Sequence, residues 1–227
     1  MTEQARHAVV TGTSSGIGAA IAARLLDGGW RVTGLSRTAP AGLGPAYTHI
    51  AVDLLDDAAL RAAVAGLRAD ALVHAAGLMR GAVLGALDAA AGETLWRLHV
   101  AAAASLADAL VPAMPQGGRV VLIGSRTAAG AAGRSQYAAT KAALVGMARS
   151  WAIELAPRNI TVNVVAPAAT DTPMLKDPAR AGHVPKLPPI GRYVRPEEVA
   201  ATAAFLLGPD AGAITGQQIV ICGGSSL

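Results

Sequence analysis

The sequence predicts an α/β fold in three layers, in which helices cover both faces of one doubly wound sheet of seven parallel strands. Short apolar runs rich in β-branched residues alternate along the chain with alanine- and leucine-rich stretches of helical length. A glycine-rich turn joins the first of these runs to the first helical stretch. The 227 residues, of which 52% are hydrophobic, are enough for one large domain and leave little room for a second core. We therefore expect a single domain over residues 1–227.

Seven short runs carry the predicted strands. Apolar and β-branched side chains dominate them, which is typical of strands that are buried on both faces of a sheet. The runs are Val9–Val10, Arg31–Leu35, His49–Val52, Ala71–His74, Arg119–Ile123, Thr161–Val165 and Gln218–Ile221.

Two connections depart from the regular alternation. Residues 38–45 are too few and too rich in glycine and proline to hold a crossover helix. Residues 173–189 carry five of the thirteen prolines, which predicts a long loop. Long loops in compact domains usually cover a functional site, so we expect a lid at about 173–193.

Composition and charge exclude several classes of protein. The net charge is +4, but the arginines form no basic run and aromatic residues make up only 3% of the chain, so we expect no nucleic-acid partner. The lone Cys222 excludes an internal disulfide and suits a reducing compartment. No apolar run approaches the length of a membrane span and residues 1–6 lack a signal-peptide pattern. We expect a soluble cytoplasmic protein without a membrane partner.

The glycine-rich turn has the setting of a phosphate site. The segment Thr11-Gly-Thr-Ser-Ser-Gly-Ile-Gly18 follows the strand-like run His7–Thr11 and precedes the helical stretch Ala19–Leu26. Free N–H groups and the helix dipole point at an anion in such a turn. Gly12 would turn the chain and Gly16 would let the backbone approach a pyrophosphate. Gly18 would let helix and strand pack closely, and the hydroxyls at positions 13–15 would add donors.

The end of the second strand bears on which dinucleotide binds. A carboxylate there would accept bonds from a free ribose 2′-hydroxyl, but the residues are Ser36, Arg37 and Thr38. A guanidinium beside hydroxyls suits a 2′-phosphate, so NADP(H) is favoured over NAD(H); the alternative is a solvated Arg37 without a ligand. Asp53, at the end of the third strand, could accept from the adenine amino group or cap the next helix.

A tyrosine and a lysine stand one helical turn apart in Tyr137-Ala-Ala-Thr-Lys141. On a helix the ammonium of Lys141 would lie near the phenol of Tyr137 and favour its ionised form, which would suit a general acid or base. Ser125 follows a predicted strand at the carboxyl edge of the sheet, where ligands bind. Its hydroxyl could bind a substrate oxygen, with Thr127 and Ser135 as alternatives.

These motifs, in this order, resemble those of the classical short-chain dehydrogenase/reductase family, and the resemblance runs over nearly the whole chain. The first glycine segment is similar to the family's TGxxxGIG motif, and Tyr137 to Lys141 is similar to its YxxxK motif, with Ser125 in the place of the family's serine. Further segments that resemble the family are Asn163–Pro167, Asp171–Met174, Pro189–Arg192, Glu197–Ala200, and Gly216 with Gly223 and Gly224.

The resemblance implies a Rossmann fold that binds NAD(P) and assigns roles to the site. Tyr137 would exchange a proton with the substrate oxygen, Lys141 would lower the pKa of Tyr137 and bind the nicotinamide ribose, and Ser125 would position the carbonyl. Thr172 would contact the carboxamide. The family also implies a homotetramer or homodimer built on the helix of Tyr137 and the last strand. The cofactor-binding residues would be Gly12, Ser14, Ser15, Gly16, Ile17, Gly18, Ser36, Arg37, Asp53, Leu54, Ala75, Ala76, Gly77, Tyr137, Lys141, Pro167, Thr170 and Thr172.

Two histidines stand where the family usually has asparagines. His74 opens His74-Ala-Ala-Gly77, in place of an asparagine that braces the sheet, and a structural role is the favoured interpretation. His99 aligns with the family's catalytic asparagine, and it could serve in a modified proton relay or be a packed helix residue. We therefore include His99 among the candidate catalytic residues.

The predicted function is an oxidoreductase that moves a hydride between NADP(H) and a ketone or secondary alcohol, with no metal. The alternatives are a non-catalytic NAD(P)-binding regulatory or scaffolding homologue and, ranked lower, a lyase, epimerase or dehalogenase on the same fold. The substrate would be a small molecule, and arginines at 126 and 134 hint at an acidic one. Candidate wall residues are Leu78, Met79, Arg126 and Leu175.

Overall fold

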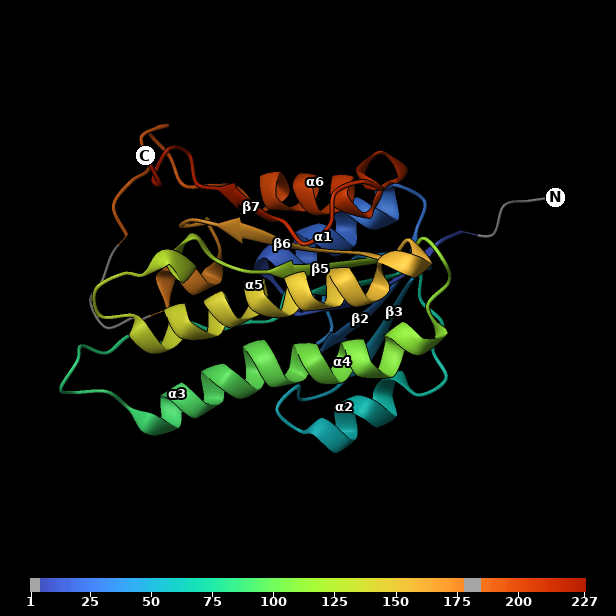
Figure 1. The fold of residues 1–227 in the computed structure, drawn as a ribbon, viewed down its shortest axis with the longest axis horizontal. Coiled ribbons are helices and arrows are strands. Elements are labelled where there is room, and N and C mark those ends of the chain that lie inside the picture. The colour runs from blue at the N-terminus through green and yellow to red at the C-terminus, as the bar shows by residue number, and fades with distance from the viewer. Residues whose placement is uncertain (1–4, 178–184) are drawn as a thin grey trace.

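The computed structural model describes residues 5–177 and 185–227, and its centre is a parallel sheet of seven strands (Figure 1). The strand order is β3-β2-β1-β4-β5-β6-β7, and each neighbouring pair is parallel. The strands are β1 His7–Thr11, β2 Arg31–Ser36, β3 Tyr47–Ala51, β4 Ala71–His74, β5 Arg119–Ile123, β6 Thr161–Pro167 and β7 Gln218–Ile221. The predicted doubly wound fold is confirmed, with every predicted strand in its place.

Helices cover both faces of this sheet. Helices α2, α4 and α5 pack on one face, and α1 and α6 pack side by side on the other (Figure 1). The helices are α1 Gly16–Asp27, α2 Asp57–Val64, α3 Ala89–Trp96, α4 Ala102–Leu110, α5 Ser135–Leu155 and α6 Pro196–Leu207. The short turns that matter below are the π turn η1 Arg97–Ala101 and the 3₁₀ turns η3 Arg126–Ala129 and η5 Pro173–Lys176.

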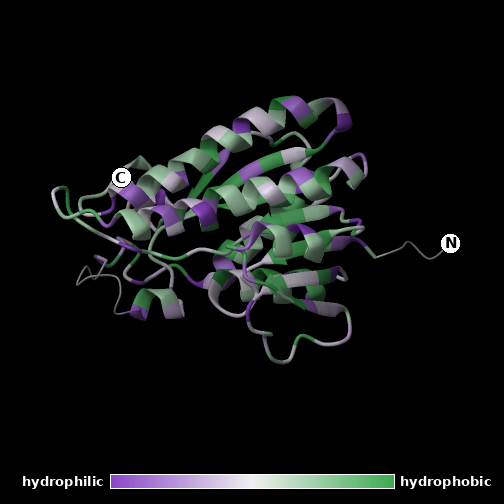
Figure 2. Cartoon of the chain, turned by 90° about the horizontal axis from the view of Figure 1, so that it is seen from below, coloured by the Kyte–Doolittle hydropathy of each residue, from purple (hydrophilic) through white to green (hydrophobic). Residues whose placement is uncertain are grey.

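The five inner strands, β1, β2, β4, β5 and β6, are largely apolar because each contributes to two cores. In β5, Val120 and Leu122 enter the core under α4 and α5, whereas Val121 and Ile123 enter the core under α1 and α6. Successive side chains of a strand point to opposite faces, so burial on both faces requires a continuous apolar run. Figure 2 shows strands that are hydrophobic along most of their length and helices with mixed surfaces.

The connections agree with the sequence where the structure describes them. No helix separates β2 from β3, and the two strands pair directly. Residues 178–184 of the predicted lid lie outside the described residues; of the rest, 173–176 form η5 and 185–189 have no regular structure. No helix within the described ranges is long and apolar enough to cross a membrane.

One feature of the helices was not predicted. Helices α3 and α4 are joined by η1, a π turn at Arg97–Ala101. In an α-helix the N–H of Ala102 would bond to the carbonyl of Leu98, but here it bonds to Arg97. The π turn contains His99 and changes the hydrogen bonding of the carbonyl of Leu98.

The strand order places the functional edge of the sheet. The chain winds outward from β1 in one direction and from β4 in the other, so the two crossovers leave a crevice at their carboxyl ends. The glycine turn follows β1, residues 75–78 follow β4, and Ser125 follows β5. These segments therefore meet at one edge.

Candidate active site

A cavity of about 860 Å³ lies along the carboxyl edge of the sheet. It brings together the predicted cofactor-binding residues, from Gly12 to Thr172, together with Ser125, Tyr137 and Lys141. Of the residues predicted to be catalytic or to bind the cofactor, His99 alone does not line the cavity. Motifs that lie far apart along the chain therefore line one connected cavity.

The glycine turn forms a cradle that side chains would fill. Gly12 has a φ of +73°, and a Cβ there would lie 2.8 Å from the Cα of Ala76. Gly16 also has a positive φ, of +58°, and lines the cavity at the start of α1. A Cβ on Gly18 would overlap the carbonyl oxygen of Gly12, so only glycine lets α1 begin this close to β1. Open backbone N–H groups at a helix N-terminus fit a pyrophosphate.

One predicted donor of the turn is used elsewhere. Thr13 is fully buried, and its hydroxyl bonds to the hydroxyls of Tyr47 at 2.8 Å and Ser36 at 3.3 Å. The expectation that all three hydroxyls at positions 13–15 face the ligand is therefore wrong for Thr13. Ser14 and Ser15 are exposed and line the cavity, and Ser15 makes no side-chain capping bond to α1.

The part of the cavity next to the ends of β2 and β3 carries one cation and one carboxylate. Arg37 is exposed and lines the cavity after β2, while the hydroxyl of the neighbouring Ser36 donates to the carbonyl of Thr38 at 2.9 Å. Asp53 also lines it, with one oxygen accepting from the N–H of Leu55. The helix-cap alternative for Asp53 is wrong, because Asp56 caps α2.

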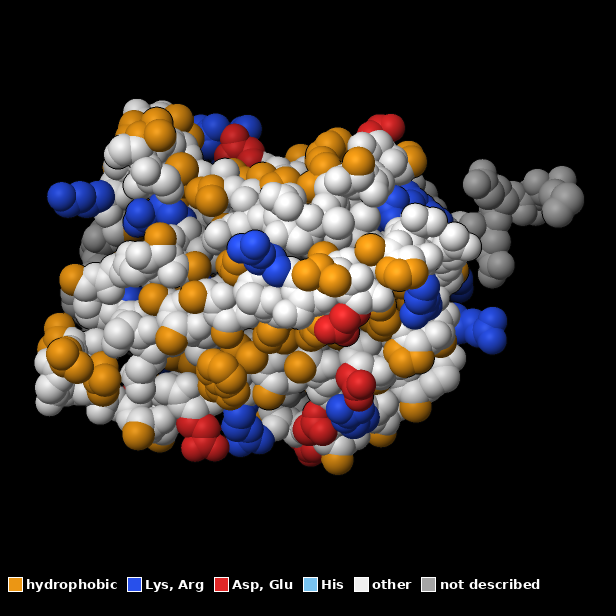
Figure 3. All heavy atoms as spheres, viewed as in Figure 1, with side chains coloured by type: hydrophobic (Ala, Val, Ile, Leu, Met, Phe, Trp, Pro, Cys, Tyr) orange, Lys and Arg blue, Asp and Glu red, His pale blue; other side chains and the backbone are white. Residues whose placement is uncertain are grey.

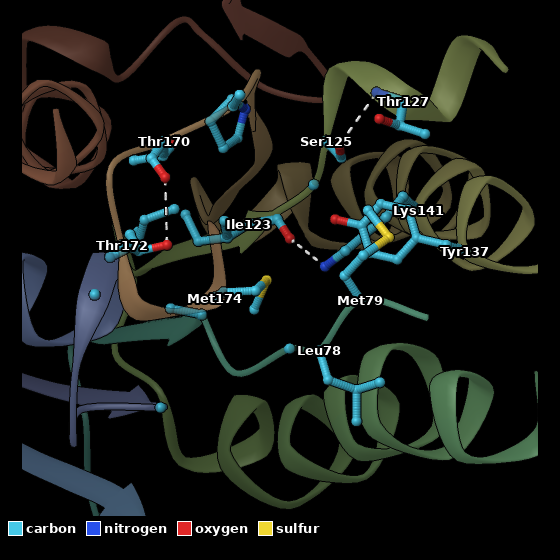
Figure 4. Close-up of a pocket in the computed structure, with 18 of the residues that line it drawn as sticks. Leu78, Met79, Ile123, Ser125, Thr127, Tyr137, Lys141, Thr170, Thr172 and Met174 are labelled. Atoms are coloured by element: carbon cyan, nitrogen blue, oxygen red, sulfur yellow. Dashed lines mark hydrogen bonds between the residues drawn. The ribbon is translucent and has the colours of Figure 1, made fainter. Parts of the chain in front are cut away.

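Tyr137 and Lys141 lie on one face of α5 at the opposite end of the cavity, as Figure 4 shows. Both side chains are buried, with exposed fractions of 8% and 4%. The Nζ of Lys141 donates to the carbonyl of Ile123 at 2.9 Å and lies 5.9 Å from the centre of the Tyr137 ring. Burial lowers the pKa of Lys141 from 10.5 to about 7. The amine of Lys141 is therefore held beside the phenol in a poorly solvated place, where burial makes its charged form less favourable than in water.

Ser125 stands two residues after β5 and faces the same end of the cavity (Figure 4). Its hydroxyl accepts from the N–H of Thr127 at 3.1 Å, which fixes the side chain at the start of η3. Its O–H remains a donor, because the oxygen is the acceptor in that bond. Of the alternatives, Thr127 also lines the cavity, whereas Ser135 is exposed and does not.

The walls around these residues agree only in part with the sequence. Leu78, Met79 and Arg126 line the cavity as predicted. Leu175 does not, because the 3₁₀ turn η5 brings Met174 to the cavity instead (Figure 4).

The C-terminal segment was not predicted to line the cavity. Gly224, Ser225 and Leu227 reach it, and Nη1 of Arg126 donates to the carbonyl of Ser225 at 3.2 Å. No sequence signal announced this contact, since it depends on a tertiary hydrogen bond to the backbone.

Both unusual histidines are completely buried. Nδ1 of His74 lies 3.1 Å from the hydroxyl of Thr11 and Nε2 lies 3.0 Å from the carbonyl of Leu98. The favoured structural interpretation of His74 therefore agrees with its contacts. His99 lies behind Gly77, with Nε2 accepting from the N–H of Leu78 at 3.1 Å and Nδ1 2.9 Å from the hydroxyl of Thr140.

Comparisons with known proteins agree with this fold. The model of the family described as enoyl-(acyl carrier protein) reductase matches residues 12–226. The chain is 34% identical over 241 residues to the 3-oxoacyl-[acyl-carrier-protein] reductase FabG of Salmonella typhimurium, covering 99% of this chain and 98% of that protein. The chain belongs to the classical short-chain dehydrogenase/reductase family. It is an oxidoreductase of the NAD(P)-dependent dehydrogenases and reductases that act on alcohol and keto groups.

Solved structures extend the comparison. A short-chain dehydrogenase from Burkholderia cenocepacia in complex with NADP has a TM-score of 0.90 and 36% identity, covering 98% of both chains. A blue fluorescent protein from a metagenomic library, in complex with NADPH, has a TM-score of 0.86 and 33% identity, again covering 98% of both chains.

The lowered pKa of Lys141 predicts a pH-dependent stability. Between pH 7 and pH 10.5 the unfolded chain holds a proton on Lys141 that the cofactor-free folded protein gives up. The free energy of unfolding should rise with pH in this window, by at most about 1.4 kcal/mol per pH unit. Below pH 7 the penalty is fully present, and above pH 10.5 it is absent.

Urea denaturation of the wild type and of Lys141→Met between pH 7 and pH 9 would measure this contribution. The variant lacks the ammonium, so the difference in stability between the two proteins should change in favour of the wild type as the pH rises. Parallel curves would show that Lys141 keeps an ordinary pKa in the folded protein.

Proposed function

We propose that this oxidoreductase moves a hydride between NADP(H) and a ketone or secondary alcohol. The observation that carries the proposal is a single cavity with the glycine cradle and Arg37 at one end and Ser125, Tyr137 and Lys141 at the other. A dinucleotide laid along this edge would supply the hydride at the end where the phenol and the serine hydroxyl meet.

Each polar side chain at that end has a task. The phenol of Tyr137 gives a proton to the carbonyl oxygen in reduction and takes it back in oxidation. The ammonium of Lys141, fixed by the carbonyl of Ile123, favours the ionised phenol and lowers the cost of that transfer. The O–H of Ser125 donates to the substrate oxygen, because its acceptor side is taken by the N–H of Thr127. Apolar walls from Leu78, Met79 and Met174 limit water at this end.

Removing the phenol hydroxyl tests the role of Tyr137. Tyr137→Phe should lower kcat by about 10²- to 10⁴-fold, since a positioned general acid supplies an effect of that size. The dissociation constant for NADPH, measured by titration calorimetry, should stay within about twofold of the wild type.

Activity that survives this change would rule out Tyr137 as the acid. A wild type that binds NADPH tightly but turns over no ketone or alcohol in a broad panel would instead favour the non-catalytic alternative.

The choice of NADP(H) depends on Arg37. The residue is exposed at the cavity, and the end of β2 offers no carboxylate for a free 2′-hydroxyl. A guanidinium gives forked, charge-assisted bonds to a phosphate. The NADP and NADPH complexes of similar proteins support this choice.

Arg37→Ala should weaken NADPH binding by about tenfold and leave NADH binding almost unchanged, because only NADPH carries the 2′-phosphate. Arg31→Ala is the matched control, since Arg31 is exposed at the opposite end of the same strand and does not line the cavity. Equal losses for the two cofactors, or equal losses in the two variants, would contradict the assignment.

Charge at the substrate end favours a substrate with an acidic group. Arg126, Arg134 and Lys186 line the cavity there, and Asp53, the acidic side chain among the described lining residues, stands at the adenosine end. One N–H of Arg126 already donates to the carbonyl of Ser225. Arg134, directly before α5, is therefore the better placed of the two arginines to bind an acidic group of the substrate.

Arg134→Met should lower kcat/KM for a 3-oxo acid by about tenfold more than for its methyl ester, since a charged hydrogen bond is lost only with the acid. Arg149→Met, on the far part of α5 and away from the cavity, is the control. The substrate-class proposal fails if acid and ester lose rate equally.

Assembly and lid complete the proposal. We expect a homodimer or homotetramer built on α5 and β7, and Figure 3 shows hydrophobic side chains over the face that carries α3, α4 and α5. Ile153 on α5 is 78% exposed and Trp96 at the end of α3 is 49% exposed, which suits an interface better than solvent.

Residues 173–193 serve as the lid, and Met174, Leu187 and Pro189 of its described part line the cavity.

A further inference from the structure

We infer that His74 and His99 form a hydrogen-bonded brace that holds the cofactor-facing segment 75–78 against the catalytic helix α5, with His99 as a positioning residue. The inference rests on the proposed function only for its effect on turnover. The sequence left open whether His99 belongs to a proton relay or is merely packed. The contacts of the two rings indicate a third role for His99, that of a positioning residue.

The hydrogen bonds of His74 determine its tautomer. The carbonyl of Leu98 can only accept, so Nε2 of His74 carries the proton and donates to it at 3.0 Å. Nδ1 then accepts from the hydroxyl of Thr11 at 3.1 Å. The same Thr11 oxygen accepts the N–H groups of Ala75 and Ala76, both at 3.0 Å. His74 therefore orients the hydroxyl that fixes the start of segment 75–78.

The π turn and His74 depend on each other. Because Ala102 donates to Arg97 within η1, the carbonyl of Leu98 does not receive its ordinary α-helical bond from Ala102. That carbonyl accepts from His74 instead. The turn that carries His99 is thus tied to the end of β4.

The hydrogen bonds of His99 fix the opposite tautomer. The N–H of Leu78 can only donate, so Nε2 is the acceptor and Nδ1 carries the proton. Nδ1 donates to the hydroxyl of Thr140 at 2.9 Å, and that hydroxyl donates to the carbonyl of Tyr137 at 2.9 Å. One neutral ring therefore connects the end of segment 75–78 to the turn of α5 that begins at Tyr137.

Packing keeps this ring in place. A Cβ on Gly77 would lie 3.1 Å from Nε2 of His99, so glycine gives the ring its room against the backbone. The rings of His99 and Tyr137 form a T-shaped pair, with a centroid distance of 5.6 Å and an interplanar angle of 85°. Both side chains are buried, and the geometry is that of a favourable aromatic pair.

The electrostatic surroundings keep both rings neutral. The charged and titratable groups that face His99 are Lys141, His74 and the phenol ring of Tyr137. Burial, and then the charge of Lys141, hold the pKa of His99 well below its ordinary value and lower that of His74 to about 3. Both nitrogens of His99 are bonded to protein groups and the residue does not line the cavity, so the ring is placed to position its neighbours rather than to meet the substrate.

Two substitutions separate the two arms of His99. His99→Asn keeps a donor near the position of Nδ1 but loses the acceptor for Leu78, so it should raise the dissociation constant for NADPH about tenfold and change kcat less than threefold. His99→Gln keeps an acceptor near the position of Nε2 but loses the donor to Thr140. It should lower kcat about tenfold and leave NADPH binding unchanged.

Thr140 gives an independent measure of the α5 arm. Thr140→Val should lower kcat about as much as His99→Gln, with NADPH binding unchanged, whereas Thr140→Ser keeps the hydroxyl and should behave as the wild type. NADPH binding is measured by titration calorimetry without substrate, so this arm of the test stands even if no turnover is found. The Thr140 pair keeps the inference testable if a His99 variant does not fold.

Two results would overturn the inference. If His99→Asn and His99→Gln change only the melting temperature, or lower kcat and NADPH binding alike, His99 is a packing residue and not a brace. If one limb of the pH profile of kcat disappears in both His99 variants but is kept in Thr140→Val, His99 carries a proton in the reaction. Separate effects on binding and on kcat, with an unchanged pH profile, support the brace.

Discussion

The bond from the ammonium of Lys141 to the carbonyl of Ile123 is the interaction on which the rest of the site depends. It joins the second turn of α5 to the last residue of β5. The helix that carries Tyr137 is thereby fixed against the strand that precedes Ser125. A buried charge is costly unless it is bonded, and one carbonyl satisfies only part of an ammonium. In the proposed mechanism this cost falls where a cation beside the phenol of Tyr137 would favour its ionised form.

This cost explains why the surroundings of Lys141 are built as they are. The rings of His74 and His99 lie close enough for its charge to lower their pKa values. Protonated imidazoles there would add like charges in a place that water does not reach. Each ring instead pairs one donor with one acceptor, so both stay neutral while their hydrogen bonds are complete. Histidines replace the family's usual asparagines at positions 74 and 99, but the bonding demands of the buried backbone there are still met.

Most of the fold and much of the site could be predicted from the sequence because their causes are local. Strands buried on both faces need continuous apolar runs, and a turn such as Gly12 to Gly18 has no room for other residues. On a helix the spacing of Tyr137 and Lys141 places both side chains on one face, and the motifs around them give that spacing its significance. By contrast, the direction of the Thr13 hydroxyl is decided by Tyr47 and Ser36, which arrive from other strands. Whether Met174 or Leu175 lines the cavity depends on the 3₁₀ turn at residues 173–176, and no residue pattern predicted that turn.

The π turn shows the same limit most clearly. No residue in Leu98-His-Val-Ala101 requires it, and a regular α-helix would serve the local sequence equally well. Its partner lies outside the helix, because the ring Nε2–H of His74 needs an acceptor and the carbonyl of Leu98 supplies it. The same turn lets His99 reach both Leu78 and Thr140. The contacts of His99 therefore depend on those of His74, and we interpret the two histidines as one structural unit.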